Sequence, residues 1–363
     1  MDALTHAIVG AAVAQLPGSG NTGPGSTNKQ TIISWQKRAV IGASAALFAD
    51  IDYLLFFINP LEFLAYWHRA ETHSLLLAPL WAWLIMKCWQ RLSAWQLPTK
   101  PLYWLCLLAF ISHPILDSLT AFGTQWFAPL SRYRVAFNIL FVIDAYFTAA
   151  VLCSLCLLLI SNHLIPNHLR FKFLAVFFAA LLPCSYLFMV IQIKHHIGQQ
   201  ISASQQSITL MPQPFSPFYW SALSKSANGF AQAYIRFGND DIGQWLTTKL
   251  GIKQHQASYR LVEQIIWLNY PLIPKQENVE SHVLAVWQHR KFKPFRHFSI
   301  SPIFYDYQHT AQQTCVWFSD LRYHWPNIPP SFRYGMCRQY PLNRANDWQL
   351  SRMKYFQAQG THN

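Results

Sequence analysis

Apolar runs close to the length that crosses a membrane dominate the first half of this 363-residue chain. A helix needs about 20 predominantly apolar residues to cross the hydrocarbon core of a bilayer. The five longest runs cover residues 38–58, 74–92, 101–118, 138–160 and 172–193, and a shorter one covers 3–16. We therefore predict an α-helical membrane bundle of about five to six transmembrane helices, in which the 3–16 run is too short to cross comfortably.

The apolar runs stop near residue 195, and polar, Pro-rich sequence follows. Short alternating stretches such as "VLAVWQH", "TCVWFSDLRY" and "SFRYGM" are rich in Val, Trp, Tyr and Phe. Alternation with a period of two is typical of strands. We predict a helical transmembrane domain at 1–195, a linker and partly helical region at 196–254, in which "ANGFAQAYIRF" reads as helix or strand, and a smaller β-rich or α+β water-facing domain at 255–363.

Five residues of this tail carry structural predictions. Cys315 and Cys337 could form a disulfide if the domain lies in an oxidising compartment. Trp220, Asp320 and Arg322 are predicted as core and ion-pair residues of the β domain, with covering of a membrane-side site as the alternative. In the first half, the Gly-rich stretch "PGSGNTGPGSTN" (17–28) is predicted as a flexible loop.

The charge of the chain favours lipid rather than nucleic acid as a partner. Its formal net charge is +13, yet only 12% of residues are charged, and the positive residues cluster only in "HRKFKPFRH" (289–297). No nucleic-acid-binding motif accompanies them. Attraction to anionic lipid headgroups is the simpler reading. We expect contact with the lipid bilayer and no nucleic acid.

The distribution of Lys and Arg predicts an orientation. If all six segments cross, one side receives eight basic residues and the other receives four. The richer set is Lys29, Lys37, Arg38, Lys87, Arg91, Lys100, Arg170 and Lys172; the poorer set is Arg69, Arg132, Arg134 and Lys194. Because the richer side normally faces the cytoplasm, we expect a multi-pass protein of a bacterial inner membrane. Its N-terminus and C-terminal domain would then lie on the periplasmic side.

The few acidic residues of the first half point to a site. All five of its aspartates lie in or at the ends of apolar runs, and ionisable residues within a membrane are candidate functional groups. Histidines accompany them in "MDALTH", "FADIDYLL…WHRAETHSL" and "SHPILDSLT". The candidate metal ligands are Asp2, His6, Asp50, Asp52, His68, His73, His113 and Asp117.

Under the alternating topology, these groups fall at the same end of the bundle. Imidazoles and carboxylates suit Zn²⁺, Mn²⁺ or iron, and eight such groups exceed one tetrahedral site. We therefore predict divalent metal ions, with Zn²⁺ first and two ions bridged by a carboxylate. Each motif alone has a simpler reading: a hydrogen-bonded His113–Asp117 pair, a helix end at Asp50 and Asp52, and a helix cap at Asp2.

Three further residues are candidates for the catalytic machinery. Arg69 could contact a phosphate, or anchor the chain at the membrane interface. Thr72, like Thr120, would orient ligands or cap a helix. Asp144 in "FVIDAYF" is a catalytic candidate, with a helix N-cap as the alternative.

The order D-x-x-x-H, D-x-D, H-R-x-x-T-H-S and S-H-x-x-x-D-x-L-T-x-x-G resembles bacterial membrane-bound metal-dependent hydrolases of the YdjM/YbcI type. The resemblance covers most of the first 150 residues and includes "FAPLSRYRVAFNILFVIDAYFT" (127–148). "MPQPFSPFYW" (211–220) and "CVWFSDLRY" (315–323) look like segments of its long-tailed members. The resemblance implies a hydrolase.

A looser likeness links the motifs to zinc-dependent phospholipase C and P1-type nucleases. Their H-x-x-x-D ligand pair would correspond to His113 and Asp117. An acid followed by a histidine would correspond to Asp52 with His68 or His73, and an early histidine to His6. The chain has no downstream H-x-x-x-E pair, which puts a full three-metal set in doubt.

Together these patterns predict an integral-membrane metal-dependent hydrolase. It would cleave a phosphoester or ester in a lipid or lipid-linked substrate through metal-activated water. Two alternatives stay open: a metal-stabilised structural or regulatory membrane protein, and an ion or proton transporter. Transporter sites tend to lie near the bilayer midplane, whereas the groups here are predicted near one face.

Overall fold

The computed structural model describes residues 1–16, 33–164, 169–202, 207–251, 253–340 and 347–353, and the Gly-rich stretch 17–28 lies outside them. The chain divides into two compact units. The first comprises residues 1–59 and 67–193, and the second comprises residues 60–66 and 194–363.

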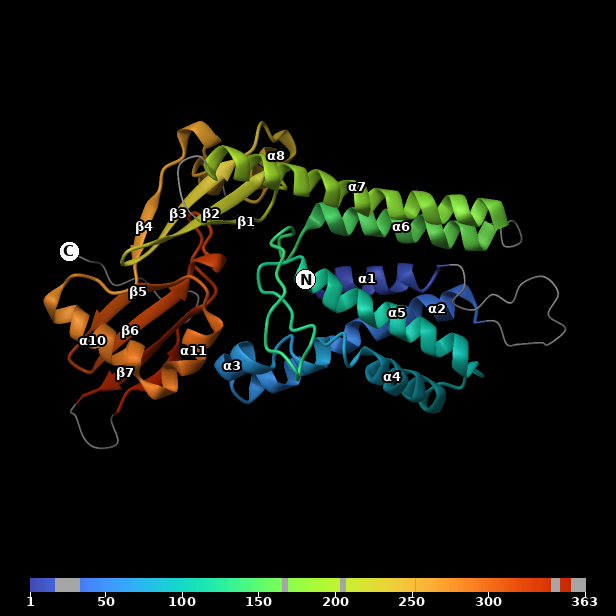
Figure 1. Cartoon of the computed structure of the whole chain (residues 1–363), viewed down its shortest axis with the longest axis horizontal. Helices are drawn as coiled ribbons and strands as arrows, with labels where there is room; N and C mark the ends of the chain where they lie inside the picture. Colours follow the sequence, from blue (N-terminus) through green and yellow to red (C-terminus); the bar gives the residue numbers. More distant parts are fainter. Residues whose placement is uncertain (17–32, 165–168, 203–206, 252, 341–346, 354–363) are drawn as a thin grey trace. The chain divides into compact units, whose positions relative to one another are not determined.

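The first unit is helical (Figure 1). Its helices are α1 (Ala3–Val13), α2 (Trp35–Leu47), α4 (Ala78–Leu92), α5 (Thr99–Ser118), α6 (Ala145–Leu164) and α7 (Leu169–Ser202), whose last residues belong to the second unit. A ten-residue 3₁₀ helix, Phe48–Phe57, continues α2, and a short one covers Glu71–His73. Small and aromatic side chains of α2, α4 and α5, such as Ala45, Ala82 and Phe110, form a buried core.

Three helices are long and apolar enough to cross a membrane: Trp35–Phe57, Ala145–Leu164 and Arg170–Ile201. The described residues therefore provide three membrane-length helices rather than the predicted five to six. Helix α4 has 15 residues and reaches only about 22 Å, less than the roughly 30 Å hydrocarbon core. Helix α1 is apolar but has 11 residues. Crossing by α1, α4 and α5 stays a prediction.

Helices α1 and α2 cross at two glycines. A Cβ on Gly42 would lie 2.3 Å from the Gly10 oxygen, and a Cβ on Gly10 would lie 2.4 Å from the Gly42 oxygen. Neither position can hold a larger side chain without separating the helices, as in other close contacts between membrane helices. Arg38 of α2 donates to the carbonyls of Ala14 and Leu16 and so closes the end of α1.

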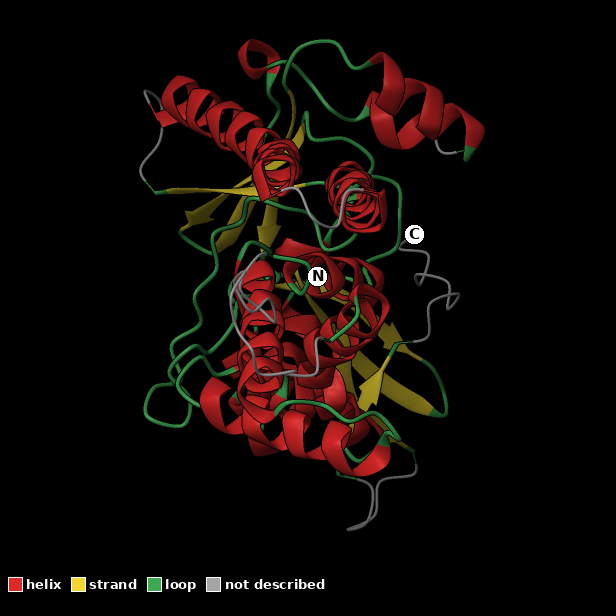
Figure 2. Ribbon diagram, turned by 90° about the vertical axis from the view of Figure 1, so that its right-hand side faces the viewer, coloured by secondary structure: helices red, strands yellow, loops and turns green. Residues whose placement is uncertain are grey.

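The second unit holds two four-stranded antiparallel sheets, and the strands in the described part of the chain, yellow in Figure 2, all belong to it. The first sheet has the order β1 (Ile208–Pro212), β2 (Tyr219–Ser226), β3 (Gly229–Arg236), β4 (Leu268–Pro271). The second has the order β5 (Pro302–His309), β6 (Gln313–Asp320), β7 (Arg333–Gln339), β8 (Gln349–Arg352). Helices α8 (Asp241–Lys249), α9 (Lys253–Ala257), α10 (Glu277–Gln288) and α11 (Lys293–Phe298) and the short α3 (Pro60–Glu62) complete it.

Several predictions for this tail can be compared with the strands. "TCVWFSDLRY" and "SFRYGM" contribute β6 and β7, as predicted. The prediction that "VLAVWQH" forms a strand was wrong. The stretch lies almost entirely in α10, where Val279, Val283 and Val286 form a buried helical stripe. Residues 196–254 were predicted as a linker and partly helical region. They contain α8 and the end of α7, but also β1 to β3, and "ANGFAQAYIRF", which reads as helix or strand, supplies β3.

The remaining tail predictions concern individual side chains. Cys315 and Cys337 face each other on β6 and β7 and form a disulfide. Trp220 is fully buried, and Arg322 donates to Asp320 at 2.8 Å, so these three residues are core and ion-pair residues of the second unit.

Candidate metal centre

Two histidine nitrogens lie close to two carboxylate oxygens in the first unit. The Nε2 atom of His113 lies 3.6 Å from Asp50 Oδ1 and 3.4 Å from Asp117 Oδ2. The Nε2 atom of His73 lies at the same two distances from the same two oxygens. Ligands about 2.0–2.1 Å from a tetrahedral metal ion are about 3.4 Å apart. Each histidine–carboxylate pair therefore has the spacing of two ligands of one ion, and Asp50, His73 and His113 form a group that could hold a metal ion.

The two histidine nitrogens need a ligand at this point. Both are buried and have no hydrogen-bond partner among the described residues. Their distances to the carboxylates exceed the usual range of hydrogen bonds. Buried polar atoms are almost always satisfied in native proteins. A metal ion between the two histidines and the two carboxylates would satisfy both nitrogens.

Hydrogen bonds on the far side of each ring set its tautomer. His113 Nδ1 lies 2.7 Å from the Ala46 carbonyl, which can only accept, so this nitrogen carries the proton. His73 Nδ1 lies 2.9 Å from the Thr72 hydroxyl, which itself donates to Asp52. Thr72 must then accept from His73. Both Nε2 atoms consequently present a lone pair to the centre, as in metal-binding histidines oriented by a carbonyl or carboxylate.

A second group of possible ligands adjoins the first and consists of His6, His113 and Asp117. His6 Nε2 lies 3.1 Å from Asp117 Oδ1, and the His6 and His113 rings are stacked. The Met1 amino group also contacts Asp117 Oδ1. Because Asp117 directs Oδ1 and Oδ2 to different groups, it can bridge two ions. Because His113 Nδ1 is hydrogen-bonded to Ala46, only Nε2 of this ring can bind metal, and His113 can therefore be a ligand of one of the two ions.

Arg69 holds the Asp117 carboxylate from inside the protein. Its guanidinium is buried, with Nε 2.8 Å from Asp117 Oδ2, and it donates to the Thr120 hydroxyl at 2.9 Å. The Arg69 backbone has a φ of 57°, a strained conformation for a residue other than glycine. Neither of the two predicted roles of Arg69, phosphate contact or interfacial anchor, matches this buried position.

Asp52 organises the loop that carries His73. Its Oδ2 accepts from the Arg69 backbone N–H at 3.1 Å and from Thr72 at 3.3 Å, and it lies 3.2 Å from His68 Nδ1. Burial lowers the pKa of His68 to about 4, against the opposing effect of Asp52. His68 is therefore neutral at neutral pH. Asp52 and His68 lie outside both groups of possible ligands.

The other two predicted aspartates cap helices. Asp2 accepts from the Thr5 backbone N–H at 3.0 Å at the start of α1. Asp144 accepts from the Phe147 backbone N–H at 2.9 Å, and the Tyr186 hydroxyl donates to it. The helix consequently begins at Ala145, and residues 138–144, predicted as part of it, precede it. Neither aspartate belongs to the two groups.

The helices bring these residues to the same end of the first unit. Asp50 lies about 25 Å along the axis from Trp35, and Asp117 lies about 27 Å from Thr99. The convergence of His6, Asp50, His73, His113 and Asp117 matches the predicted one. Sequence reasoning missed the Ala46 carbonyl and the Met1 amino group, because backbone groups leave no residue-type signal. Tyr186 gave no signal either, since tyrosine is common in apolar helices.

Comparisons with known proteins place the first part of the chain in a family. A family model described as YdjM inner membrane protein matches residues 1–196, more than half of the chain. No curated protein and no solved structure matches it. The matched region includes every residue of the candidate metal centre. The chain thus belongs to the YdjM inner membrane protein family.

Proposed function

We propose that this protein is an integral-membrane metal-dependent hydrolase. The observation that carries the proposal is that the Nε2 atoms of His73 and His113 each lie 3.4–3.6 Å from the carboxylates of Asp50 and Asp117, with both histidine lone pairs directed inward. The residues fit zinc best, with manganese or iron as alternatives, and the two faces of Asp117 favour two ions.

Divalent ions bound here would supply Lewis acidity, which polarises a phosphoryl or acyl oxygen and makes water nucleophilic near neutral pH. The protein's own part is to hold the ligands. Arg69 fixes Asp117, and the Asp52–Thr72 pair fixes His73. Asp50 has 23% of its side chain exposed, whereas His73, His113 and Asp117 are at most 1% exposed. Water and substrate would reach the centre past Asp50.

The surroundings of Asp50 favour a lipid or lipid-linked phosphoester or ester. The same 3₁₀ helix exposes Tyr53, Leu54 and Phe57, the last at 85%. This helix also forms the end of a membrane-length segment. A group cleaved here would lie near headgroup depth while its acyl chains stayed in the bilayer. From the excess of Lys and Arg at the opposite ends of the helices, we propose that this end faces the periplasm.

A metal-stabilised structural protein is the second candidate, and one observation favours it. Four protein ligands complete the tetrahedral shell of a structural zinc site, whereas catalytic sites keep one position open. The partial exposure of Asp50 favours the hydrolase, because this ligand is the one that could give way to water.

Metal content and hydrolysis measured on the same sample test the proposal. Purified full-length protein should contain about two divalent ions and should release product from phosphatidic acid or short-chain phosphatidylcholine in mixed micelles. Asp117→Asn should lose both metal and hydrolysis. Glu71→Gln is the matched control, because the Glu71 carboxylate pairs at the surface with Arg132 and lies outside both groups of possible ligands. Bound metal without hydrolysis would support the structural candidate, and protein without metal would refute both.

A further inference from the structure

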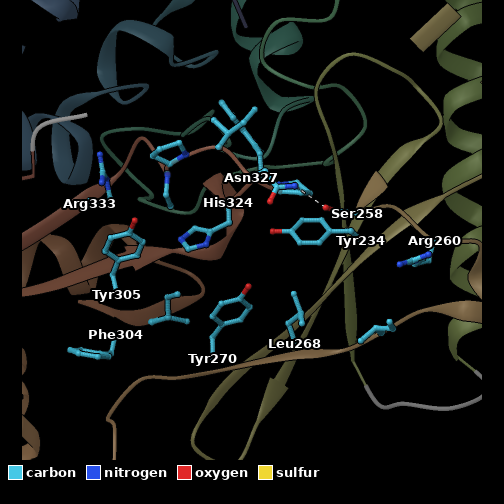
Figure 3. Close-up of a pocket in the computed structure, with 17 residues that line it drawn as sticks. Tyr234, Ser258, Arg260, Leu268, Tyr270, Phe304, Tyr305, His324, Asn327 and Arg333 are labelled. Carbon is cyan, nitrogen blue, oxygen red and sulfur yellow. Dashed lines mark hydrogen bonds between the residues drawn. The ribbon is translucent and has the colours of Figure 1, made fainter. Parts of the chain in front are cut away.

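The second unit contains a cavity of about 870 Å³ that the proposed chemistry does not use. It lies between β3 and β4 of one sheet, β5 of the other, and the loop 324–330 (Figure 3). Its volume is in the range of small-molecule sites. The floor includes the buried side chains of Tyr234, Ile303 and His324, and the rim includes the half-buried Ser258 and the exposed Asn327.

Aromatic rings from both sheets line the cavity. Tyr270 of β4 and Tyr305 of β5 approach the His324 ring edge-on, with ring centroids 6.1 and 6.2 Å away. Phe304 and Trp325 add further rings. Figure 3 shows the rings of Tyr234, Tyr270 and His324 near one another among the lining residues. Such walls offer flat apolar faces together with hydroxyl groups.

The charged groups of the cavity are positive. Arg260 and Arg333 lie at its two ends (Figure 3). Arg260 is exposed, and the Arg333 guanidinium lies over the Tyr305 ring. None of the lining residues in the described part of the chain is an aspartate or a glutamate. Burial lowers the pKa of His324 to about 4, so its ring is uncharged at neutral pH.

We propose that this cavity binds a saccharide that carries a carboxylate or phosphate group. Sugar rings present apolar C–H faces that stack on tyrosine and tryptophan, and their hydroxyls bond to Ser258, Asn327 and tyrosine hydroxyls. Arg260, at the open rim, would receive the anionic group. An aromatic box alone would also suit a quaternary ammonium ion, but the positive charge and the lack of carboxylates in the lining disfavour a cation.

Calorimetric titration of the full-length protein in phosphatidylcholine nanodiscs tests this inference. The probes are a glucuronic acid–N-acetylglucosamine disaccharide, glucose 1-phosphate, neutral diacetylchitobiose, inorganic phosphate and choline. The two acidic sugars should bind more tightly than the neutral sugar, and binding should weaken with salt. Tyr270→Ala should weaken the binding of the acidic disaccharide by about tenfold or more. Arg260→Gln should remove the preference for the acidic sugars, while Arg290→Gln, an exposed arginine outside the cavity, should keep it.

Several results would overturn the inference. One is binding of choline or inorganic phosphate without the sugars. Another is sugar binding that is unchanged in both Tyr270→Ala and Arg260→Gln. A third is no binding of any sugar by a protein whose circular dichroism shows both helix and strand. Because these titrations require no metal, their failure would leave the proposed hydrolase untouched, and Asp117→Asn should bind the sugars normally.

Discussion

The Nδ1 atom of His113 donates a hydrogen bond to the main-chain carbonyl of Ala46, 2.7 Å away. This bond joins α5 to α2 and leaves His113 Nε2 as the only nitrogen of the ring that can bind a metal ion. His113→Gln should therefore reduce the metal content by about one ion per chain. Mass-spectrometric metal analysis of the purified variant checks this. His163→Gln, an exposed histidine on α6, is the control, and unchanged metal content in both variants would contradict the assignment.

Asp144 tests whether an acid at a helix start is a cap or a catalytic group. Asp144→Ala should lower the free energy of unfolding by about 1–2 kcal/mol, because the Phe147 backbone N–H loses its acceptor. Asp144→Asn should lower the free energy of unfolding by less, since asparagine also caps helices. Both variants should keep the full metal content and hydrolytic rate per folded molecule. Loss of hydrolysis in a folded, metal-loaded Asp144→Asn protein would assign Asp144 to catalysis instead.

The contact between Gly10 and Gly42 should be sensitive to a single methyl group. Gly42→Ala places a Cβ within 2.3 Å of the Gly10 oxygen, so α1 must move and take His6 with it. We expect destabilisation of about 1–3 kcal/mol, measured as the thermal unfolding midpoint in detergent, and weaker metal retention during dialysis against a chelator. Gly198→Ala on α7 is the control, because its nearest neighbour would be 3.8 Å away. Equal stability of the two variants would contradict the tight crossing.

The second unit should lose stability as the pH falls. Burial lowers the pKa of His324 from 6.5 to about 4, so below pH 6.5 the unfolded chain binds a proton that the folded chain refuses. The contribution of His324 is complete above pH 6.5 and is lost progressively toward pH 4, by up to about 3 kcal/mol. Denaturant unfolding followed by tryptophan fluorescence should show a steeper decline between pH 6.5 and 4.5 in the wild type than in His324→Gln. Parallel declines would contradict the prediction.

The sequence predicted which residues gather at the candidate site better than it predicted what each does. The apolar runs placed Asp50, His113 and Asp117 near helix ends, and alternation of helices brought these ends together. The direction of a side chain in the connecting loop could not be predicted in this way. Arg69 points inward to Asp117 because its backbone adopts a left-handed conformation that residue type does not signal.

The second unit shows where periodicity fails. In "ENVESHVLAVWQ", apolar residues fall at both alternating and helical spacings, so the short window "VLAVWQH" suggested a strand. The longer stripe of Val279, Val283 and Val286 determines the helix, because all three pack into the interior. Length, rather than local alternation, distinguishes the two patterns.

The measurement that tests the central claim most directly is anomalous X-ray scattering at the absorption edge of the metal found in the purified protein. It should reveal an ion between Asp50, His73, His113 and Asp117, and a second ion beside His6 and the opposite oxygen of Asp117. Both peaks should be absent from Asp117→Asn crystals. Wild-type crystals with no anomalous peak within ligand distance of His73 and His113 would contradict the metal centre.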